Sequence, residues 1–420
     1  CNLHQIFFVQ QVSTCISSII AIPYVISSEI CPGADLYKVR TTLVSVALFI
    51  SGLTTIIQTE AGMRLALLQG PSYTFLAPVH MYLSQTKYVR IKKNFFQIAG
   101  SLAASAIIPF LAGITGIAGT LRNFIGPITV STMLFLVMYS TIEISLQRIS
   151  MHWMSLVQII LLTVSILFLC NVECPLPSWK NGSLSIKKYR LFERYSYLIA
   201  ILITWGCCLL LSITNATTTN SAIRLDRAET ITALQNAPWF RIPKLGEYGT
   251  LKFNLNLFIG CVVAAFLTVI ETIGTYHTAA LVSEETVPPS HALNRGMIVE
   301  GLGTALAGLF HVGSGICTFA ANVGIMETTK VTRSMMVVAG LILISAGLFT
   351  KVGAVLSAIP DPLVGAIIAI TSATAVGIAF SYMQLVDLSV ARNMAIVGWS
   401  LVFGIMTPKY FTENSINIGK

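Results

Sequence analysis

Glu271 is the residue in this sequence that packing alone explains least. It follows the apolar run 266–270 and is the only Asp, Glu, Lys or Arg between positions 255 and 282. An ionised carboxylate at the centre of a bilayer costs roughly 3 kcal/mol or more, so it needs a reason to be there. Its oxygens can accept hydrogen bonds from a small polar solute or carry a proton. The alternative is a protonated or capping group packed against polar neighbours.

Other polar side chains also lie inside apolar stretches. Asn322 carries an amide that can both donate and accept, which suits the recognition of a planar polar ligand. Gln10 and Gln11 are adjacent amides in the first apolar stretch, where they serve either as site residues or as interhelical hydrogen bonds. Glu300 follows Arg295 by about one turn, and this spacing predicts an ion pair at the membrane interface.

The composition requires that these side chains be held by membrane-spanning elements. Of 420 residues, 55% are hydrophobic and only 10% are charged, whereas a soluble domain carries about 25% charged residues. The mean hydropathy of +0.78 indicates a polytopic membrane protein. In such a protein a net charge of +9 favours loops that face membrane lipid over a nucleic-acid surface. The nine cysteines lack metal-ligand spacing, and no catalytic triad, P-loop or dinucleotide fingerprint indicates an enzyme.

Apolar runs with few charges predict the spans, because a helix needs about 20 residues to cross roughly 30 Å of hydrocarbon. The predicted fold class is therefore an all-α polytopic membrane protein. The thirteen predicted spans are 5–28, 41–59, 65–86, 95–121, 123–142, 149–172, 195–223, 255–282, 296–312, 316–329, 334–358, 362–382 and 393–407.

Two of these spans are interrupted by residues that form helices poorly, at 69–76 in the third and at 318–324 in the tenth. Gly and Pro also open the fifth span at 125–127 and the twelfth at 359–362. This correspondence predicts a seven-plus-seven inverted repeat, on which the fourteenth span is absent. Unpaired backbone groups are tolerated at membrane depth only inside protein or around a cavity, so both breaks predict one shared site. The alternative is that they merely kink two packed helices.

These motifs resemble the nucleobase-ascorbate transporter family, and the resemblance covers almost the whole chain. The most specific element is the signature Asn-x-Gly-x-x-x-x-Thr-Lys/Arg, which Asn322, Gly324, Thr329 and Lys330 match. The sequence is most similar to the animal, ascorbate-transporter-like branch. The further matching positions are Gln58, Thr59, Arg64, Leu65, Gln69, Phe75 to Pro78, Ile273, Gly274, Tyr276, Pro288, Pro289, His291, Ala292, Asn294 to Gly296, Glu300, Gly301, Leu385, Asp387, Arg392 and Asn393.

The resemblance implies a transporter with a core domain that slides against a gate domain in an elevator-like cycle. The core domain would comprise 1–121 and 255–358, and the gate domain 122–213 and 359–408, with a mid-chain loop at 214–254 and a polar tail at 409–420. It also implies an integral protein of the plasma membrane and a homodimer formed through the gate domains. The implied substrates are uracil, purines or ascorbate, moved with sodium or protons and without another cofactor.

The resemblance also assigns roles to individual positions. Glu271 would bind the substrate, Tyr73 would stack near its ring beside Thr74, and Ala321 and Asn322 would occupy the substrate-linked signature positions.

Three of the positions depart from the family pattern. Gln11, in the first-span pair with Gln10, replaces a His, Thr275 replaces an Asp four residues after Glu271, and Ala321 replaces Gln, Glu or Pro. All three changes remove polar or shape-determining chemistry.

Two hypotheses from different classes follow. The first is a cation-coupled secondary transporter of a small planar polar solute, either ascorbate or a nucleobase. The departures and the absent fourteenth span support the second, a transport-inactive or truncated paralogue that acts by association with an intact protomer. An anion exchanger or channel of the same architecture fits less well, because Glu271 is ill-suited to an anion pathway.

Overall fold

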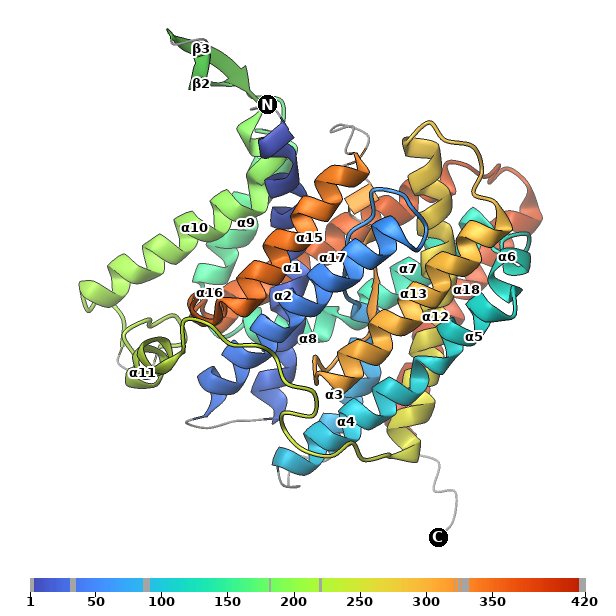
Figure 1. Ribbon diagram of the computed structural model, residues 1–420, viewed down its shortest axis with the longest axis horizontal. Helices are drawn as coiled ribbons and strands as arrows, with labels where there is room; N and C mark the ends of the chain where they lie inside the picture. The colour runs from blue at the N-terminus through green and yellow to red at the C-terminus, as the bar shows by residue number, and fades with distance from the viewer. Residues whose placement is uncertain are drawn as a thin grey trace.

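The computed structural model describes residues 4–30, 35–85, 91–180, 183–218, 221–320, 322, 323, 326 and 332–414. Side chains are described from residue 17 onward within these ranges, except at 85, 91–93, 176–180, 183–187, 194 and 412. Most of this chain is helical and packs into one body, from which a strand hairpin extends (Figure 1).

The first half contributes the early spans. They are interrupted where the sequence predicted a break, at the strand β1 (Gln69–Pro71) and the 3-10 turn η1 (Tyr73–Phe75). The helices are α1 (His4–Ile30), α2 (Leu36–Glu60), α3 (Leu76–Gln85), α4 (Ile91–Ser105), α5 (Ile107–Ile114), α6 (Ile117–Leu121), α7 (Pro127–Ser140), α8 (Ile142–Ile149), α9 (Met154–Leu167) and α10 (Leu191–Ile213).

The second half repeats this pattern, with the strand β4 (Ile316–Thr318) at the second predicted break. Its helices are α11 (Ala228–Asn236), α12 (Leu255–Val282), α13 (Ser290–Leu309), α15 (Arg333–Leu348), α16 (Thr350–Ser357), α17 (Asp361–Met383) and α18 (Ala391–Glu413). In the described chain, seven helical segments are long and apolar enough to cross a membrane; α15 and α16 meet that criterion only together, and they are bent by 82° at the break between them.

The prediction of a helical membrane fold is confirmed, although the sequence did not predict two short strand pairs. β2 (Cys174–Lys180) and β3 (Ser183–Tyr189) form an antiparallel hairpin that projects from the helical body (Figure 1). The other pair, β1 with β4, joins the two breaks antiparallel, with Gln69 opposite Thr318 and Pro71 opposite Ile316. The two interruptions therefore meet, as a shared site requires.

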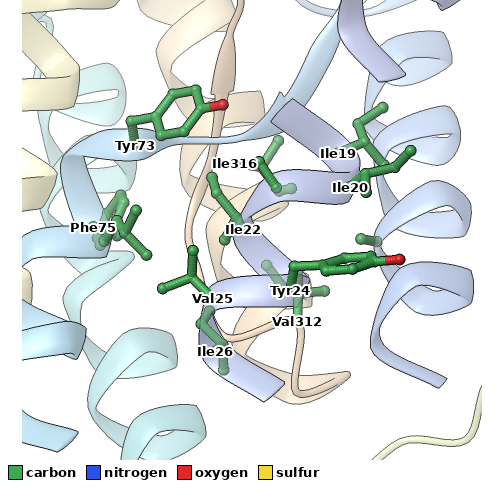
Figure 2. Close-up of a cluster of buried hydrophobic side chains, with 14 of the residues drawn as sticks. Ile19, Ile20, Ile22, Tyr24, Val25, Ile26, Tyr73, Phe75, Val312 and Ile316 are labelled. Carbon is green, nitrogen blue, oxygen red and sulfur yellow. The ribbon is translucent and has the colours of Figure 1, made fainter. Parts of the chain in front are cut away.

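This β1–β4 crossing satisfies its backbone groups without a helix. Beyond the strands, the N–H of Ser72 donates to the carbonyl of Gly315 at 2.9 Å, and the N–H of Phe319 donates to Leu68 at 3.1 Å. Glycine is needed here because a Cβ at Gly315 would lie 2.3 Å from the Phe75 ring. A buried apolar cluster supports the crossing, and Figure 2 shows residues of α1, η1 and β4 within it.

The helices form two sets by their contacts. α2 packs along α15 and α16, and α13 packs on α4 and α5, while α17 packs against α7, α8 and α9. Helix α1 touches both sets, through α2 and α15 on one side and α17 and α10 on the other. The cavity described below lies where these sets meet.

The mid-chain loop predicted at 214–254 contains the helix α11 and then an extended strap, residues 237–254. The strap crosses the ends of several helices, as the olive segment along the lower part of Figure 1 shows. Three backbone N–H groups attach it there, from Arg241 to Leu348, Gly246 to Leu309 and Lys252 to Phe96, at 3.0 to 3.2 Å.

Candidate functional site

A cavity opens beside the β1–β4 crossing, with about 50 Å³ of room for the centre of a water-sized sphere; the space between its lining atoms is about 570 Å³, which includes open solvent. Its polar lining comes from Ser17 and Ser18 on α1, Thr74 on η1, Glu271 on α12 and Thr371 on α17. Leu134 and Met138 of α7, Cys317 of β4, and Ser72, Tyr73, Phe319, Ala320 and Ala375 complete the wall. Both halves of the chain and both helix sets therefore contribute.

Glu271 is buried, yet its carboxylate lines the cavity. The Thr74 hydroxyl donates to Glu271 Oε2 at 3.2 Å. Thr74 is held in turn by Ser72, whose Oγ accepts from the Thr74 N–H at 3.2 Å and lies 3.0 Å from the Thr74 hydroxyl. The turn after β1 thus sets the position of the only side-chain hydrogen bond that the structure gives Glu271.

Tyr73 lies on the same turn and is buried at the cavity wall. Its hydroxyl has no hydrogen-bond partner among the described residues. A buried hydroxyl without a partner loses the hydrogen bonds it makes in water. Tyr73 therefore contributes to the cavity wall and keeps a buried hydroxyl without a partner in the described chain.

Glu300 corrects a sequence prediction. The predicted ion pair with Arg295 is wrong, and Glu300 Oε1 instead accepts hydrogen bonds from three donors around the crossing. These are Thr318 Oγ1 at 2.5 Å, Gln69 Nε2 at 3.1 Å and the Tyr276 hydroxyl at 3.1 Å. Residues five positions apart point about 140° away from each other around a helix, so this spacing cannot pair Arg295 with Glu300.

Two other predicted site residues lie near the cavity without lining it. The Thr275 hydroxyl donates to the backbone carbonyl of Glu271 at 2.9 Å, so it supports α12 internally. Asn322 is buried, and its Nδ2 donates to the carbonyl of Ala66 at 3.2 Å, just before β1. Its Oδ1 has no partner among the described residues.

The remaining predicted positions cannot be placed by their side chains. Gln10 and Gln11 lie on α1, but their side chains are outside the described part of the chain, as are the signature residues Ala321, Gly324, Thr329 and Lys330. Glu271, Thr74 and Tyr73 therefore line the cavity together, whereas Thr275 and Asn322 do not line it.

Sequence reasoning missed the hydroxyl groups of Ser17, Ser18, Ser72 and Thr371. Serine and threonine are common in membrane helices, where they bond to their own backbone, so a single hydroxyl position carries no signal. The adjacent pair Ser17-Ser18, one turn and a half beyond Gln11 on an apolar helix, is the one pattern that could have indicated a polar face.

The arrangement indicates which solutes the cavity can hold. It presents one carboxylate and several hydroxyls, and no Lys, Arg or His lines it in the described chain. A carboxylate accepts hydrogen bonds only, so it selects a solute with N–H or O–H donors. Apolar residues on the opposite wall suit a flat ring, which gives a site for a small planar polar molecule.

Comparisons with known proteins agree with this geometry. Residues 4–413 match the model of the Permease family, Xan_ur_permease. The chain is 29% identical to Solute carrier family 23 member 2 of Mus musculus, across 98% of this chain and 67% of that protein. It is 27% identical to Nucleobase-ascorbate transporter 12 of Arabidopsis thaliana, across 96% of this chain and 58% of that protein.

Among solved structures, the transmembrane domain of the cyanobacterial bicarbonate transporter BicA shares this fold. The TM-score is 0.59 at 13% sequence identity, and the match covers 94% of this chain and 96% of that domain. At this identity the likeness concerns the fold alone, and it confirms the predicted inverted-repeat transporter architecture.

Proposed function

This chain belongs to the Permease family, and on that premise we propose that it carries ascorbate or a nucleobase across the membrane together with a coupling cation. It is an integral membrane transporter of the nucleobase-ascorbate type and not an enzyme. One observation supports the substrate class above the others. The cavity places the carboxylate of Glu271, held by Thr74, next to the ring and unpartnered hydroxyl of Tyr73.

Both candidate solutes present what this cavity can recognise. Ascorbate offers several O–H donors and a nucleobase offers ring N–H donors, and each has a flat ring. The name of the matched Nucleobase-ascorbate transporter 12 covers both solutes. A neutral nucleobase is favoured by the absence of a cationic side chain in the described cavity lining, since ascorbate is an anion at neutral pH.

The coupling cation would resolve that electrostatic problem. A sodium ion or a proton entering with the solute would offset the buried charge of Glu271, whose surroundings offer no basic partner in the described lining. Thr275 supplies no second carboxylate at the family's usual position.

We also propose an elevator-like movement, with α1 to α6, α12, α13, α15 and α16 as the core domain and α7 to α10, α17 and α18 as the gate domain. The cavity is lined by both, through α1, η1 and α12 on one side and α7 and α17 on the other. A site at the interface of two bundles, one of which moves against the other, is a common transporter design. A homodimer formed through the gate domains at the plasma membrane completes the proposal.

Uptake of labelled ascorbate, uracil and xanthine into cells expressing the chain, with and without sodium, tests this proposal. We expect saturable uptake of one solute, and its loss in Glu271→Gln at equal surface expression. Uptake by Glu271→Gln at the wild-type level would remove the site assignment.

Ligand-dependent thermal stabilisation of the purified protein separates a binder from an inactive paralogue. A solute at 100 times its Kd adds about 2.7 kcal/mol to the folded state. Neither uptake nor stabilisation by any of the three solutes would favour the transport-inactive alternative.

A further inference from the structure

Arg40 lies fully buried on α2, away from the cavity described above. Its Nη2 forms an ion pair with Asp361 Oδ1 at 2.9 Å, its Nη1 reaches Oδ2 at 3.4 Å, and its Nε donates to Ser27 Oγ at 3.1 Å. The guanidinium also lies 4.0 Å from the centre of the Tyr24 ring. Asp361 is the first residue of α17, so this ion pair joins the two helix sets.

A second buried arginine makes the reciprocal connection. Arg148, at the end of α8 in the gate set, donates from Nη2 to Ser28 Oγ on α1 at 2.7 Å. Its Nε has no partner among the described residues. Each helix set therefore contributes one buried arginine that contacts the other set, and the two contacts lie at the same level of the fold.

The level of these contacts can be read along two helices. On α1, Ser27 and Ser28 lie ten positions beyond the cavity residues Ser17 and Ser18, which is about 15 Å at 1.5 Å per residue. On α17, Asp361 lies ten positions before Thr371 of the cavity. Both arginines thus cross between the helix sets about 15 Å from the cavity, on the same face of the molecule.

We propose that the Arg40–Asp361 ion pair, with the Arg148–Ser28 contact, is a lock that closes one access route to the cavity. This inference rests on the proposed sliding of core against gate. A buried pair is strongly disfavoured when only one partner is removed, because the other charge stays buried and unpaired. The lock holds while both partners stay together, and it opens when the movement carries them apart into water.

Cys317 is a buried residue of the cavity lining, so the alkylation rate of its thiol reports access to the cavity without any knowledge of the substrate. The test is the rate of N-ethylmaleimide addition to Cys317 in the membrane-reconstituted protein, read residue by residue by mass spectrometry. Cys170, beyond the end of α9, is the internal reference. We expect Asp361→Asn to raise the Cys317 rate at least fivefold and to leave the Cys170 rate unchanged.

Asp226→Asn is the matched control, because it makes the same chemical change at an exposed pair, Arg224–Asp226 at 2.6 Å, in the mid-chain loop. Should Asp361→Asn fail to fold, Ser28→Ala removes the reciprocal contact with little change in volume, and it should raise the Cys317 rate in the same direction. An unchanged Cys317 rate in a folded variant would overturn the lock.

The readout also separates this inference from the proposed function. Faster alkylation in a chain that takes up none of the tested solutes would support the lock and count against the substrate assignment. Normal uptake with an unchanged Cys317 rate would support the substrate assignment and count against the lock.

Discussion

Glu271 on α12 and Glu300 on α13 are two buried carboxylates beside the same β1–β4 crossing, but their surroundings differ. Glu271 accepts one side-chain hydrogen bond, from Thr74, and lines the cavity. Glu300 accepts three, from Gln69, Thr318 and Tyr276, and does not line it. All three donors of Glu300 reach Oε1, and its Oε2 is buried without a partner among the described residues, so the two carboxylates differ in their donors and in their access to the cavity.

Both residues are glutamates in neighbouring apolar helices, so the difference comes from their surroundings and not from the residue type. A carboxylate whose donors are all protein groups contributes to stability, because removing it leaves those donors unsatisfied. A carboxylate that lines the cavity can instead accept hydrogen bonds from a ligand there. Substitutions at the two sites should therefore separate stability from binding, and the following experiments test that separation.

The largest effect is expected from Glu300→Ala. Three buried donors would lose their acceptor at once, and each unsatisfied donor costs about 1–3 kcal/mol. We expect the free energy of unfolding to fall by about 3 kcal/mol or more, measured as a lower thermal unfolding temperature of the purified protein. Glu285→Ala, in the exposed loop after α12, is the control and should leave that temperature unchanged. Equal unfolding temperatures for both variants would contradict the fastening role.

Glu271→Gln should behave in the opposite way. Its amide oxygen can still accept from Thr74, so we expect the ligand-free unfolding temperature to stay near that of the wild type. Solute affinity should fall about 10- to 100-fold, because a hydrogen bond to a charged group contributes about 1.5–3 kcal/mol. Titration of the transported solute by thermal shift measures both quantities on one sample. A loss of stability as large as that of Glu300→Ala would contradict the separation of binding at Glu271 from stability at Glu300.

Tyr276→Phe removes one of the three donors to Glu300 and keeps the ring. The loss should be about 1 kcal/mol of unfolding free energy, since Gln69 and Thr318 still serve the carboxylate. Chemical denaturation of the purified protein would measure it, and solute affinity should remain at the wild-type value. A weaker affinity without a change in stability would place Tyr276 in the ligand site instead.

The smallest effect is expected from Thr74→Val, which removes the hydroxyl beside Glu271 at nearly constant volume. We expect the KM for uptake to rise about fivefold, because one hydrogen bond contributes about 1 kcal/mol. Thr74→Ser retains the hydroxyl and should restore the wild-type KM. An unaltered KM in the valine variant would mean that Thr74 does not position Glu271.

Much of this fold could be predicted from the sequence because hydrophobic length sets the membrane helices. The breaks at 69–76 and 318–324 were also predictable, since Gly, Pro and polar residues stand out in an apolar run. Their pairing as strands depends on register between segments far apart in the chain, which no local pattern specifies. The β2–β3 hairpin was missed because two prolines obscure the pattern of β2, and the alternation in β3 spans only about five residues.

The candidate site was predictable where burial of a charge gave a signal, as at Glu271. It was not predictable for Glu300, whose role depends on Gln69 and Thr318 approaching from other elements. Ser17 and Ser18 were missed for a similar reason. A hydroxyl becomes a site residue only when the fold turns it toward the cavity, and α1 does this together with α17.

The contact between α2 and α15 has a consequence for biosynthesis. A Cβ at Gly52 would lie 2.5 Å from the backbone oxygen of Gly340, so the two helices meet with no room for a side chain at that point. Ribosomes deliver α2 into the membrane long before α15 exists. Until then α2 presents to lipid a stripe of small and polar residues, with Arg40 among them, that the finished protein buries. During synthesis α2 therefore depends on other helices, or on an insertase or chaperone, for its polar contacts. Substitutions where α2 meets α15 should first show as degradation of the newly made protein.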